Sequence, residues 1–246
     1  MIHSTSKTFI EIGSNCFDTL NFLGGEGWSG VIIEPVEYYL NKISPKYENI
    51  VYENFAVSDI NEKKDFVYFD PEKLDSIEDY RESFASFDRS DLGKWVSGAG
   101  SLDESGISTA FDNFPEEFMI KKKVDCFTLD YVIEKHKLDR VDALKIDAEG
   151  QEWRILRLFS FRVRPFWIKF ETDHFKKSEK GRRNLRYIYS KLMSLGYSIR
   201  KLKHDCICIH SSTYISSPTL STDDAIKRYK KDFQHLKTLD ELESVV

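Results

Sequence analysis

The chain has 246 residues, of which 41% are hydrophobic and 14% aromatic, and its formal net charge is −5. A chain of this length and apolar content can bury its own core as a folded α/β domain, which excludes a disordered chain. The acidic balance gives no reason to expect a nucleic acid as partner. Since no apolar run could span a membrane or serve as a signal peptide, we expect a soluble, cytoplasmic protein.

The predicted site is organised around residues 8–20, TFIEIGSNCFDTL. It begins as a β-strand, breaks at Gly13 and continues into a segment that predicts a helix over residues 18–23. A glycine lets the backbone approach a ligand, and the free N–H groups of a helix N-terminus face that ligand. The stretch therefore predicts a ligand cradle.

A second apolar run, residues 30–33, is followed by Glu34. This acid comes about twenty residues after the glycine turn, where a nucleotide-binding βαβ unit places a carboxylate on ribose hydroxyls. Pro35 ends the strand and starts a helix over residues 36–43. A third strand is expected over residues 50–57, and strands that alternate with short helices predict a parallel, helix-covered sheet.

The regular pattern is interrupted after the third strand. Residues 64–69 alternate as an extra strand, and residues 70–115 are acidic and rich in turn residues. A connection of this length inside a compact domain favours a functional lid over a plain surface loop. The pattern returns with a strand over residues 123–129 and a helix over residues 130–137.

The most informative stretch after the first is residues 141–152, VDALKIDAEGQE. It predicts a buried strand that delivers Asp147 to its carboxyl end, with Lys145 inside the strand as a structural or ion-pairing residue. A helix follows to about residue 159. The next strand, residues 166–172, delivers Glu171.

The C-terminal part begins with an amphipathic helix over residues 181–195, which Gly196 ends. Residues 197–202 and 205–210 then predict an antiparallel pair of strands. The remainder, residues 211–246, is a polar tail with one predicted helix near residues 223–236.

These elements predict a single α/β domain over residues 1–210, with an insertion at about 70–115. Its sheet is mostly parallel, with the antiparallel pair at its C-terminal end. In an open parallel sheet, ligands bind beyond the carboxyl ends of the strands. The residues at or just after such ends are Gly13, Glu34, Asp59, Asp147 and Glu171. We expect them to meet in one site.

Six segments resemble, in the same order, the landmarks of the FkbM-type methyltransferases. They are FIEIGSN, GVIIEP, NFAVSD, SGAGSL, FTLDYV and KIDAEGQE, and together they span about residues 9–174. The last one, with TLD upstream of it, is the most specific. The resemblance implies a Rossmann-like class I methyltransferase sheet and S-adenosylmethionine as cofactor.

The resemblance also implies site residues. The first loop would hold the methionine moiety of the cofactor, and Glu34 would bind the two ribose hydroxyls. Ala56 and its neighbours Phe55 and Val57 would lie by the adenine. Asp147 and Glu149 would sit at the methyl-transfer end. The full set implied in cofactor binding is Glu11, Gly13, Ser14, Asn15, Asp18, Thr19, Glu34, Pro35, Phe55, Ala56, Asp147 and Glu149.

The first loop departs from the family pattern. The family usually has an aspartate where Glu11 stands and a second glycine near Phe17. Asp18 or Thr19 would then replace the lost contact. This departure leaves a catalytically inactive nucleotide-binding module as an alternative. A nicotinamide-dependent oxidoreductase on a similar sheet is another, although the sequence lacks the fuller G-x-G-x-x-G motif of that class.

The function that the resemblance implies is methyl transfer to a hydroxyl of a saccharide or other small polar metabolite. Such a reaction needs a base within hydrogen-bond reach of the hydroxyl. His174 is the first candidate, because its intrinsic pKa lies near neutral pH and it follows a strand end. Asp147 and Glu171 are the alternative bases.

A metal site is the less favoured interpretation of the same edge. Asp147, Glu149 and Glu171 offer the oxygen ligands that a divalent cation such as Mg²⁺ prefers. The four cysteines form no C-x-x-C pair, so neither a zinc site nor a disulfide frame is expected. We therefore predict a site without a metal.

Overall fold

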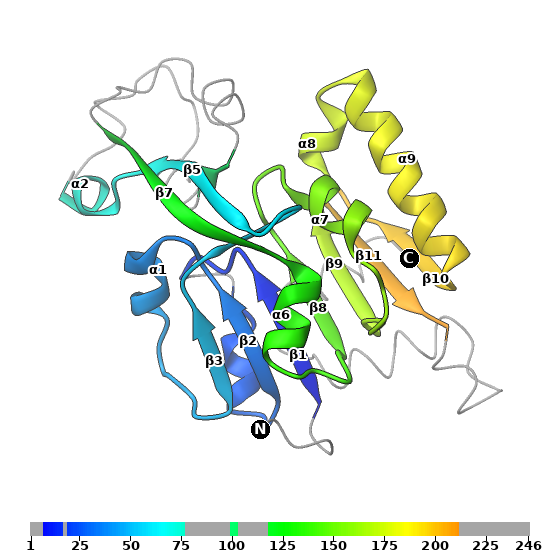
Figure 1. Ribbon diagram of the computed structural model, residues 1–246, viewed down its shortest axis with the longest axis horizontal. Helices are drawn as coiled ribbons and strands as arrows, with labels where there is room; N and C mark the ends of the chain where they lie inside the picture. Colours follow the sequence, from blue (N-terminus) through cyan, green and yellow to red (C-terminus); the bar gives the residue numbers. More distant parts are fainter. Residues whose placement is uncertain (1–6, 17–18, 77–98, 103–117, 212–246) are drawn as a thin grey trace.

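The computed structural model describes residues 7–16, 19–76, 99–102 and 118–211 (Figure 1). This part of the chain is a mixed α/β fold built on a mostly parallel sheet of seven strands, accompanied by a second sheet of four strands. Most of the predicted lid, the C-terminal tail beyond residue 211 and its predicted helix lie outside the described residues.

The main sheet has the strand order β10-β11-β9-β8-β1-β2-β3. Its strands are β1 (Thr8–Ile12), β2 (Ser29–Ile33), β3 (Ile50–Glu53), β8 (Ala143–Ile146), β9 (Trp167–Glu171), β10 (Tyr197–Lys201) and β11 (Asp205–His210). From β3 to β9 all neighbours are parallel, whereas β11 runs antiparallel to both β9 and β10. The parallel strands therefore bring their carboxyl ends to one edge.

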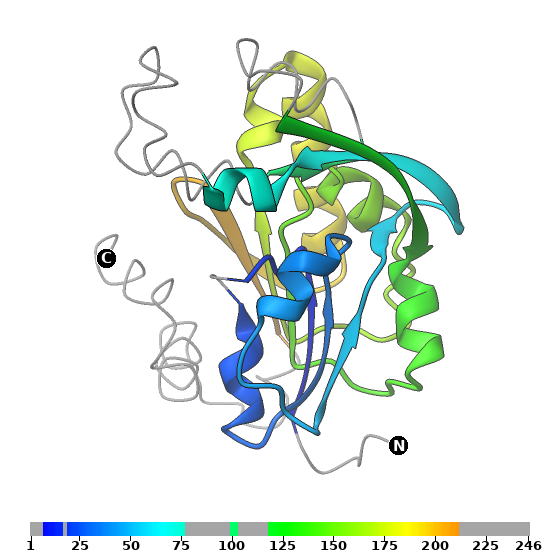
Figure 2. The ribbon, with the colours of Figure 1, turned by 90° about the vertical axis from the view of Figure 1, so that its left-hand side faces the viewer.

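Helices cover both faces of the main sheet. The helices among the described residues are η1, a 3-10 helix (Leu20–Gly24), and the α-helices α1 (Glu37–Lys42), α2 (Pro71–Ser76), α6 (Leu129–Lys135), α7 (Glu152–Leu158), α8 (Asp173–Lys176) and α9 (Glu179–Ser194), of which α2 lies beside the second sheet (Figure 1). Figure 2 shows η1 and α6 on opposite sides of the sheet. Among the described residues, no helix is both long enough and apolar enough for a membrane crossing.

Each face has its own apolar core because side chains alternate along the strands. Ile10 and Leu144 belong to a cluster with buried residues of α6, α7 and α9. Phe9 and Ile32, one step along their strands, belong to a second cluster with Leu23 of η1. A strand that is buried on both faces has apolar side chains at successive positions. The two cores therefore explain the continuous apolar runs in the sequence.

The second sheet has the order β4-β7-β5-β6. Its strands are β4 (Ala56–Ser58), β5 (Glu62–Phe69), β6 (Gly100–Ser101) and β7 (Met119–Thr128). In Figure 1, β5 and β7 cross the molecule at the carboxyl edge of the main sheet. One face of this sheet packs against the residues that follow β2, in a cluster of Val36, Tyr39, Ala56, Phe66, Tyr68, Val124 and Cys126. The second sheet thus borders the predicted site.

Two predicted elements differ in the structure. The strand predicted over residues 50–57 is two strands, β3 in the main sheet and β4 in the second sheet. The chain leaves the main sheet at Asn54, whose Nδ2 donates a hydrogen bond to the carbonyl oxygen of Glu34 at 2.9 Å. The helix predicted over residues 18–23 is only the short η1, and residues 17 and 18 lie outside the described part.

A lysine of α9 holds the end of α7. Lys191 Nζ donates to three carbonyl oxygens there, those of Leu156, Arg157 and Phe159, at 3.1, 2.9 and 2.9 Å. The last carbonyls of a helix have no partner within it, so a cation from a neighbouring helix satisfies them.

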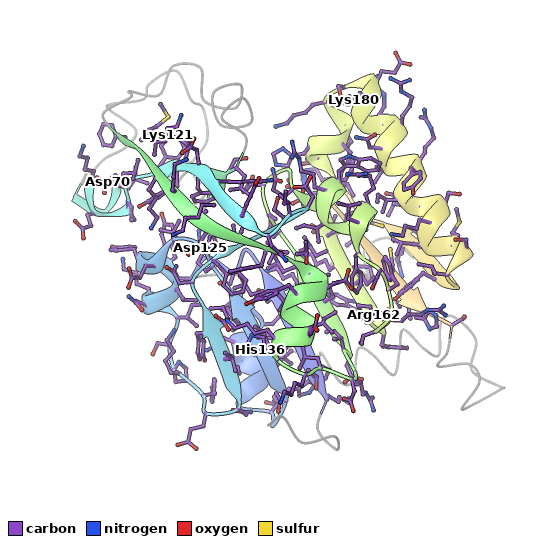
Figure 3. The ribbon with its side chains drawn as sticks, viewed as in Figure 1. Asp70, Lys121, Asp125, His136, Arg162 and Lys180 are labelled. Atoms are coloured by element: carbon purple, nitrogen blue, oxygen red, sulfur yellow. The ribbon has the colours of Figure 1, made fainter. Side chains whose placement is uncertain are left out.

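We expect Lys191→Met to lower the free energy of unfolding by about 1.5–3 kcal/mol, the contribution of a hydrogen bond to a charged group. Urea unfolding measures the change. Lys180, exposed on the same helix and labelled in Figure 3, is the matched control. Lys180→Met should change stability by no more than about 0.5 kcal/mol. Equal effects of the two variants would show that the helix end does not depend on Lys191.

Candidate functional site

Backbone hydrogen bonds draw three strand ends together at the carboxyl edge. Asp147 N donates to Ile12 O, and Gly13 N donates to Ile33 O, each at 2.9 Å. Asn15 N donates to Glu34 Oε2 at 2.8 Å. The residues that follow β1, β2 and β8 therefore meet, as the sequence predicted for Gly13, Glu34 and Asp147.

Gly13 is the contact point between the first loop and the end of β8. Its φ is +73°, in the left-handed region. A Cβ at this position would lie 1.7 Å from the carbonyl oxygen of Asp147. Only glycine satisfies both the backbone angle and this close approach.

Glu34 is a buried acid between two amide groups. Its Oε1 accepts from Val36 N and its Oε2 from Asn15 N, each at 2.8 Å. Burial raises the pKa of Glu34 to about 7, although these two hydrogen bonds act against the rise. Each oxygen keeps a second lone pair, so the carboxylate can still accept from a ligand's hydroxyls.

Glu11 and Lys145 form a buried ion pair across β1 and β8. Lys145 Nζ lies 3.1 Å from Glu11 Oε1, and the two residues face each other in the strand register. Thr19 Oγ1 and Leu20 N both donate to Glu11 Oε2, at 2.6 and 2.8 Å. Burial raises the pKa of Glu11, and the charge of Lys145 opposes that rise. The ion-pairing role predicted for Lys145 is thus confirmed.

The loop after β8 is held in an unusual backbone conformation. Glu149 and Gly150 have φ angles of +48° and +99°. Glu152, at the first turn of α7, accepts from Ala148 N at 2.8 Å and from Gly150 N at 3.0 Å. Its side chain is buried, and burial raises its pKa to about 7. Glu152 thus orders the loop that carries Asp147 and Glu149.

His174 lies between two carboxylates. Its Nε2 is 3.1 Å from Glu149 Oε2, with which it is hydrogen-bonded, and 3.2 Å from Glu171 Oε2. Burial alone would lower the pKa of His174, but the two glutamates outweigh it and raise the pKa to about 10. At neutral pH the imidazole therefore holds its proton, which argues against the near-neutral base that the sequence favoured.

Asp147 completes this cluster. Burial raises its pKa well above the usual value, Lys145 acts against that shift, and the charge of Glu149 adds to it. Ligand atoms of Glu149, Glu171 and His174 lie within 4.8 Å of one another, as do those of Asp147, Glu152 and Glu171. These sets have the donors for a divalent cation, yet the protonated His174 already supplies a positive charge among them.

The other predicted residues fall into distinct places. Ser14 and Asn15 are buried in the first loop, and Thr19 binds Glu11. Pro35 follows Glu34 and is partly exposed, and Ala56 packs in the cluster of Val36 beside it. Phe55 instead packs in the main core against Phe127, with ring centroids 4.9 Å apart. Asp59 pairs with Lys64, and Asp18 lies outside the described residues.

Sequence reasoning gave no role to Glu152 and Ser101. Glu152 ends the KIDAEGQE segment, and an acid in the first turn of a helix is the usual signal for a carboxylate bound to free amides. Ser101 Oγ donates to the carbonyl oxygen of Glu149 at 3.1 Å, across 48 residues of sequence. No local pattern signals that contact.

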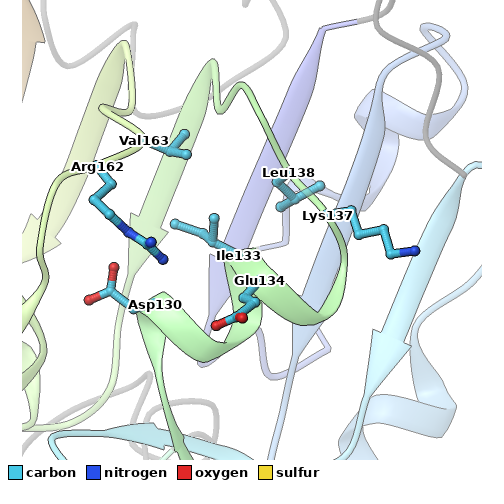
Figure 4. Close-up of a pocket in the computed structure, with 7 residues that line it drawn as sticks. All are labelled: Asp130, Ile133, Glu134, Lys137, Leu138, Arg162 and Val163. Atoms are coloured by element: carbon cyan, nitrogen blue, oxygen red, sulfur yellow. The ribbon is translucent and has the colours of Figure 1, made fainter.

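A separate pocket of about 420 Å³ lies between α6 and the segment before β9 (Figure 4). It is lined by Asp130, Ile133, Glu134, Lys137, Leu138, Arg162 and Val163. The Asp130 carboxylate already accepts hydrogen bonds from the backbone N–H and the hydroxyl of Ser160. None of the lining residues belongs to the carboxyl-edge site, so this pocket is a different place on the molecule.

The raised pKa of His174 predicts a pH dependence of stability. Because the folded pKa of about 10 exceeds the ordinary 6.5, its stabilising effect is complete below pH 6.5 and is lost as pH rises through 10. Urea unfolding of the wild type and of His174→Gln from pH 6 to 10.5 measures it. The difference in free energy of unfolding between the wild type and His174→Gln should decrease as pH rises. A constant difference would contradict the raised pKa.

Comparison with known proteins identifies the family. The family model of the methyltransferase FkbM domain matches residues 11–199, which include the first loop, the second sheet and the loop after β8. Neither the search of curated proteins nor the search of solved structures gives a match. Since the family match covers well over half of the sequence, the chain belongs to the FkbM methyltransferase family.

Proposed function

We propose that the chain transfers a methyl group from S-adenosylmethionine to a hydroxyl of a saccharide or another small polar metabolite. The observation that carries this proposal is the meeting of Gly13, Glu34 and Asp147 at one edge of the sheet. The strand order β3-β2-β1-β8-β9, all parallel, supports a Rossmann-like class I arrangement, in which ligands bind at this edge.

The residues at this edge fit the chemistry of the cofactor. Glu34 is a buried carboxylate at the end of β2, with lone pairs left for the two ribose hydroxyls. The loop of Gly13, Ser14 and Asn15 would hold the amino-acid end. When bound, S-adenosylmethionine supplies a methyl group that its sulfonium has already activated, so the chain's task is alignment and removal of a proton.

Asp147 is the preferred acceptor of the hydroxyl's proton. It is a carboxylate at the end of β8, and the charge of Lys145 favours its ionised form, which can take up a proton, although burial and the neighbouring carboxylates raise its pKa. Glu171 is the alternative base. His174, as a cation, holds Glu149 and Glu171 in place and can donate a hydrogen bond.

The function is tested with a radiolabelled methyl donor. Purified protein is incubated with S-adenosylmethionine and a panel of monosaccharides, glycosides and polyols, and label transfer is counted. We expect transfer to at least one hydroxyl acceptor, with Asp147→Asn slowing it by roughly 100-fold or more, in line with the loss of a general base. Binding of the cofactor with no transfer to any acceptor would favour the inactive nucleotide-binding module.

Glu34→Gln should weaken the binding of S-adenosylhomocysteine by about 10- to 100-fold. This corresponds to the loss of one charge-assisted hydrogen bond of roughly 1.5–3 kcal/mol. Because the pKa of Glu34 is about 7, wild-type affinity should also rise between pH 6 and 8 as the carboxyl ionises, and the variant should lose that part of the rise. Equilibrium dialysis at several pH values measures both effects.

The matched control is Glu53→Gln. Glu53 ends the next strand, but its carboxylate pairs with Lys135 and His136, at 2.7 and 2.8 Å. This variant should bind the ligand as the wild type does. If both variants bound S-adenosylhomocysteine equally well, Glu34 would have no role in cofactor binding.

A further inference from the structure

The second sheet touches the methyl-transfer end of the site through a buried serine. Ser101 is 2% exposed and lies in β6, which pairs antiparallel with β5. Its hydroxyl donates to the carbonyl oxygen of Glu149 at 3.1 Å. The neighbouring Gly100 packs so closely on β5 that a Cβ there would lie 2.6 Å from the Phe66 ring. The serine is therefore held by a packed strand.

The carbonyl that Ser101 binds belongs to a residue in a costly conformation. Glu149 is not a glycine, and its φ of +48° lies in the left-handed region. A non-glycine residue in that region is strained and persists only where its surroundings hold it. Three hydrogen bonds hold the Glu149 backbone in this conformation. The amides of Ala148 and Gly150 donate to the Glu152 carboxylate, and the Ser101 hydroxyl donates to the carbonyl oxygen of Glu149.

The conformation of Glu149 decides where its carboxylate lies. Glu149 Oε2 is 3.1 Å from His174 Nε2. The His174 ring lies against the next residue, since a Cβ on Gly150 would be 3.7 Å from Nδ1. A rotation of the Glu149 backbone would therefore move one carboxylate of the cluster and the imidazolium that it holds.

We infer that Ser101 is a positioning residue for the methyl-transfer end of the site. It fixes the Glu149 backbone from the second sheet and so sets the place of the Glu149 carboxylate relative to His174. The inference rests on the proposed function. If Ser101 has this role, the second sheet contributes to the geometry of the methyl-transfer end.

Ser58 provides a matched control. It is also a buried serine of the second sheet, in β4, and its hydroxyl lies 3.4 Å from Gln151 Oε1. Both serines thus reach the same loop from the same sheet. Of these two serines, Ser101 has the hydrogen bond to Glu149, whereas the Ser58 hydroxyl reaches Gln151, so the two alanine variants differ in the contact under test.

The experiment compares Ser101→Ala, Ser101→Thr and Ser58→Ala with the wild type. For Ser101→Ala we expect unchanged affinity for S-adenosylhomocysteine and a kcat lower by roughly 10- to 100-fold, since a misplacement of about 1 Å can have that effect. Ser101→Thr keeps the hydroxyl and should recover most of kcat. Ser58→Ala should keep kcat within about threefold.

A second readout does not depend on turnover. The imidazole resonances of His174, assigned with His174→Gln, are recorded by NMR at one pH near neutrality. They should shift in Ser101→Ala and stay in place in Ser58→Ala and Ser101→Thr. Equal resonances in all variants would overturn the inference, even if methyl transfer is found. A shift confined to Ser101→Ala would support it even if no acceptor is methylated.

Discussion

Replacing Lys145 with methionine is expected to lower the free energy of unfolding by about 3–5 kcal/mol, the typical cost of leaving a buried charge without its partner. Glu11 is fully buried, and its Oε1 lies 3.1 Å from Lys145 Nζ. Methionine has a similar length but no charge. Glu11 would then have to bind a proton or remain ionised without its counter-ion, and both are unfavourable.

A double variant separates this cause from simple loss of packing. Glu11→Gln keeps an oxygen that can accept from Thr19 and Leu20, which now bind Glu11 Oε2. In the combination with Lys145→Met, no buried charge is left unpaired. We expect the double variant to recover most of the lost stability, because a buried ion pair replaced as a unit is often nearly neutral.

Lys169→Met is the comparison on the neighbouring strand. Lys169 lies beside Lys145 in the register and pairs with Asp205 at 3.2 Å. Asp205 is partly exposed, so water can solvate it when the lysine is lost. The loss of stability should be clearly smaller than for Lys145→Met. Urea unfolding at pH 7 is measured for the wild type, Lys145→Met, the double variant and Lys169→Met. A change in the free energy of unfolding below about 1 kcal/mol for Lys145→Met would contradict the expected role of the ion pair.

Gly13→Ala is the second large effect. An alanine there must adopt a φ of +73°, and its Cβ would stand 1.7 Å from the carbonyl oxygen of Asp147. The left-handed conformation costs roughly 1–2 kcal/mol, and forcing atoms into a packed place adds roughly 1–3 kcal/mol. The end of β8 must move away, so we expect S-adenosylhomocysteine binding to be lost as well.

Gly27→Ala isolates the effect of the backbone angle. Gly27 has a φ of +81°, but a Cβ there meets no atom within 4 Å. Its alanine variant should lose only the roughly 1–2 kcal/mol of the left-handed conformation and bind the ligand normally. Thermal unfolding and ligand titration of both variants test this. Equal losses in the two would mean that the contact between Gly13 and Asp147 is not needed.

Much of the main sheet could be predicted because its signals are local. The apolar runs of β1, β2 and β8 are continuous, as is typical of strands covered on both faces. The acids Glu34 and Asp147 follow two of those runs directly, so their common edge followed from the parallel order. Lys145, alone among apolar residues, needed a partner, and Glu11 is that partner.

The second sheet could not be predicted in the same way. β4 pairs with β7, whose partner residues lie 70 positions further along the chain. β6 has only two residues, too few for a pattern. Without these pairings, residues 50–57 read as a single strand, and the contact of Ser101 with Glu149 could not be foreseen.

The chemistry of His174 also depended on the fold. Its place just after a strand end was visible in the sequence, but its pKa was not. Glu149 and Glu171 reach the imidazole from two different strand ends, and together they raise the pKa to about 10. The intrinsic pKa of His174 is therefore a poor guide to its protonation here, because the neighbouring charges outweigh it.

The most direct test of the central claim is a calorimetric titration of the wild-type protein with S-adenosylhomocysteine, with NAD⁺ and NADH titrated separately under the same conditions. We expect saturable binding of S-adenosylhomocysteine at one site per chain and no binding of either nicotinamide cofactor. Saturable binding of a nicotinamide cofactor, with no heat from S-adenosylhomocysteine, would contradict it.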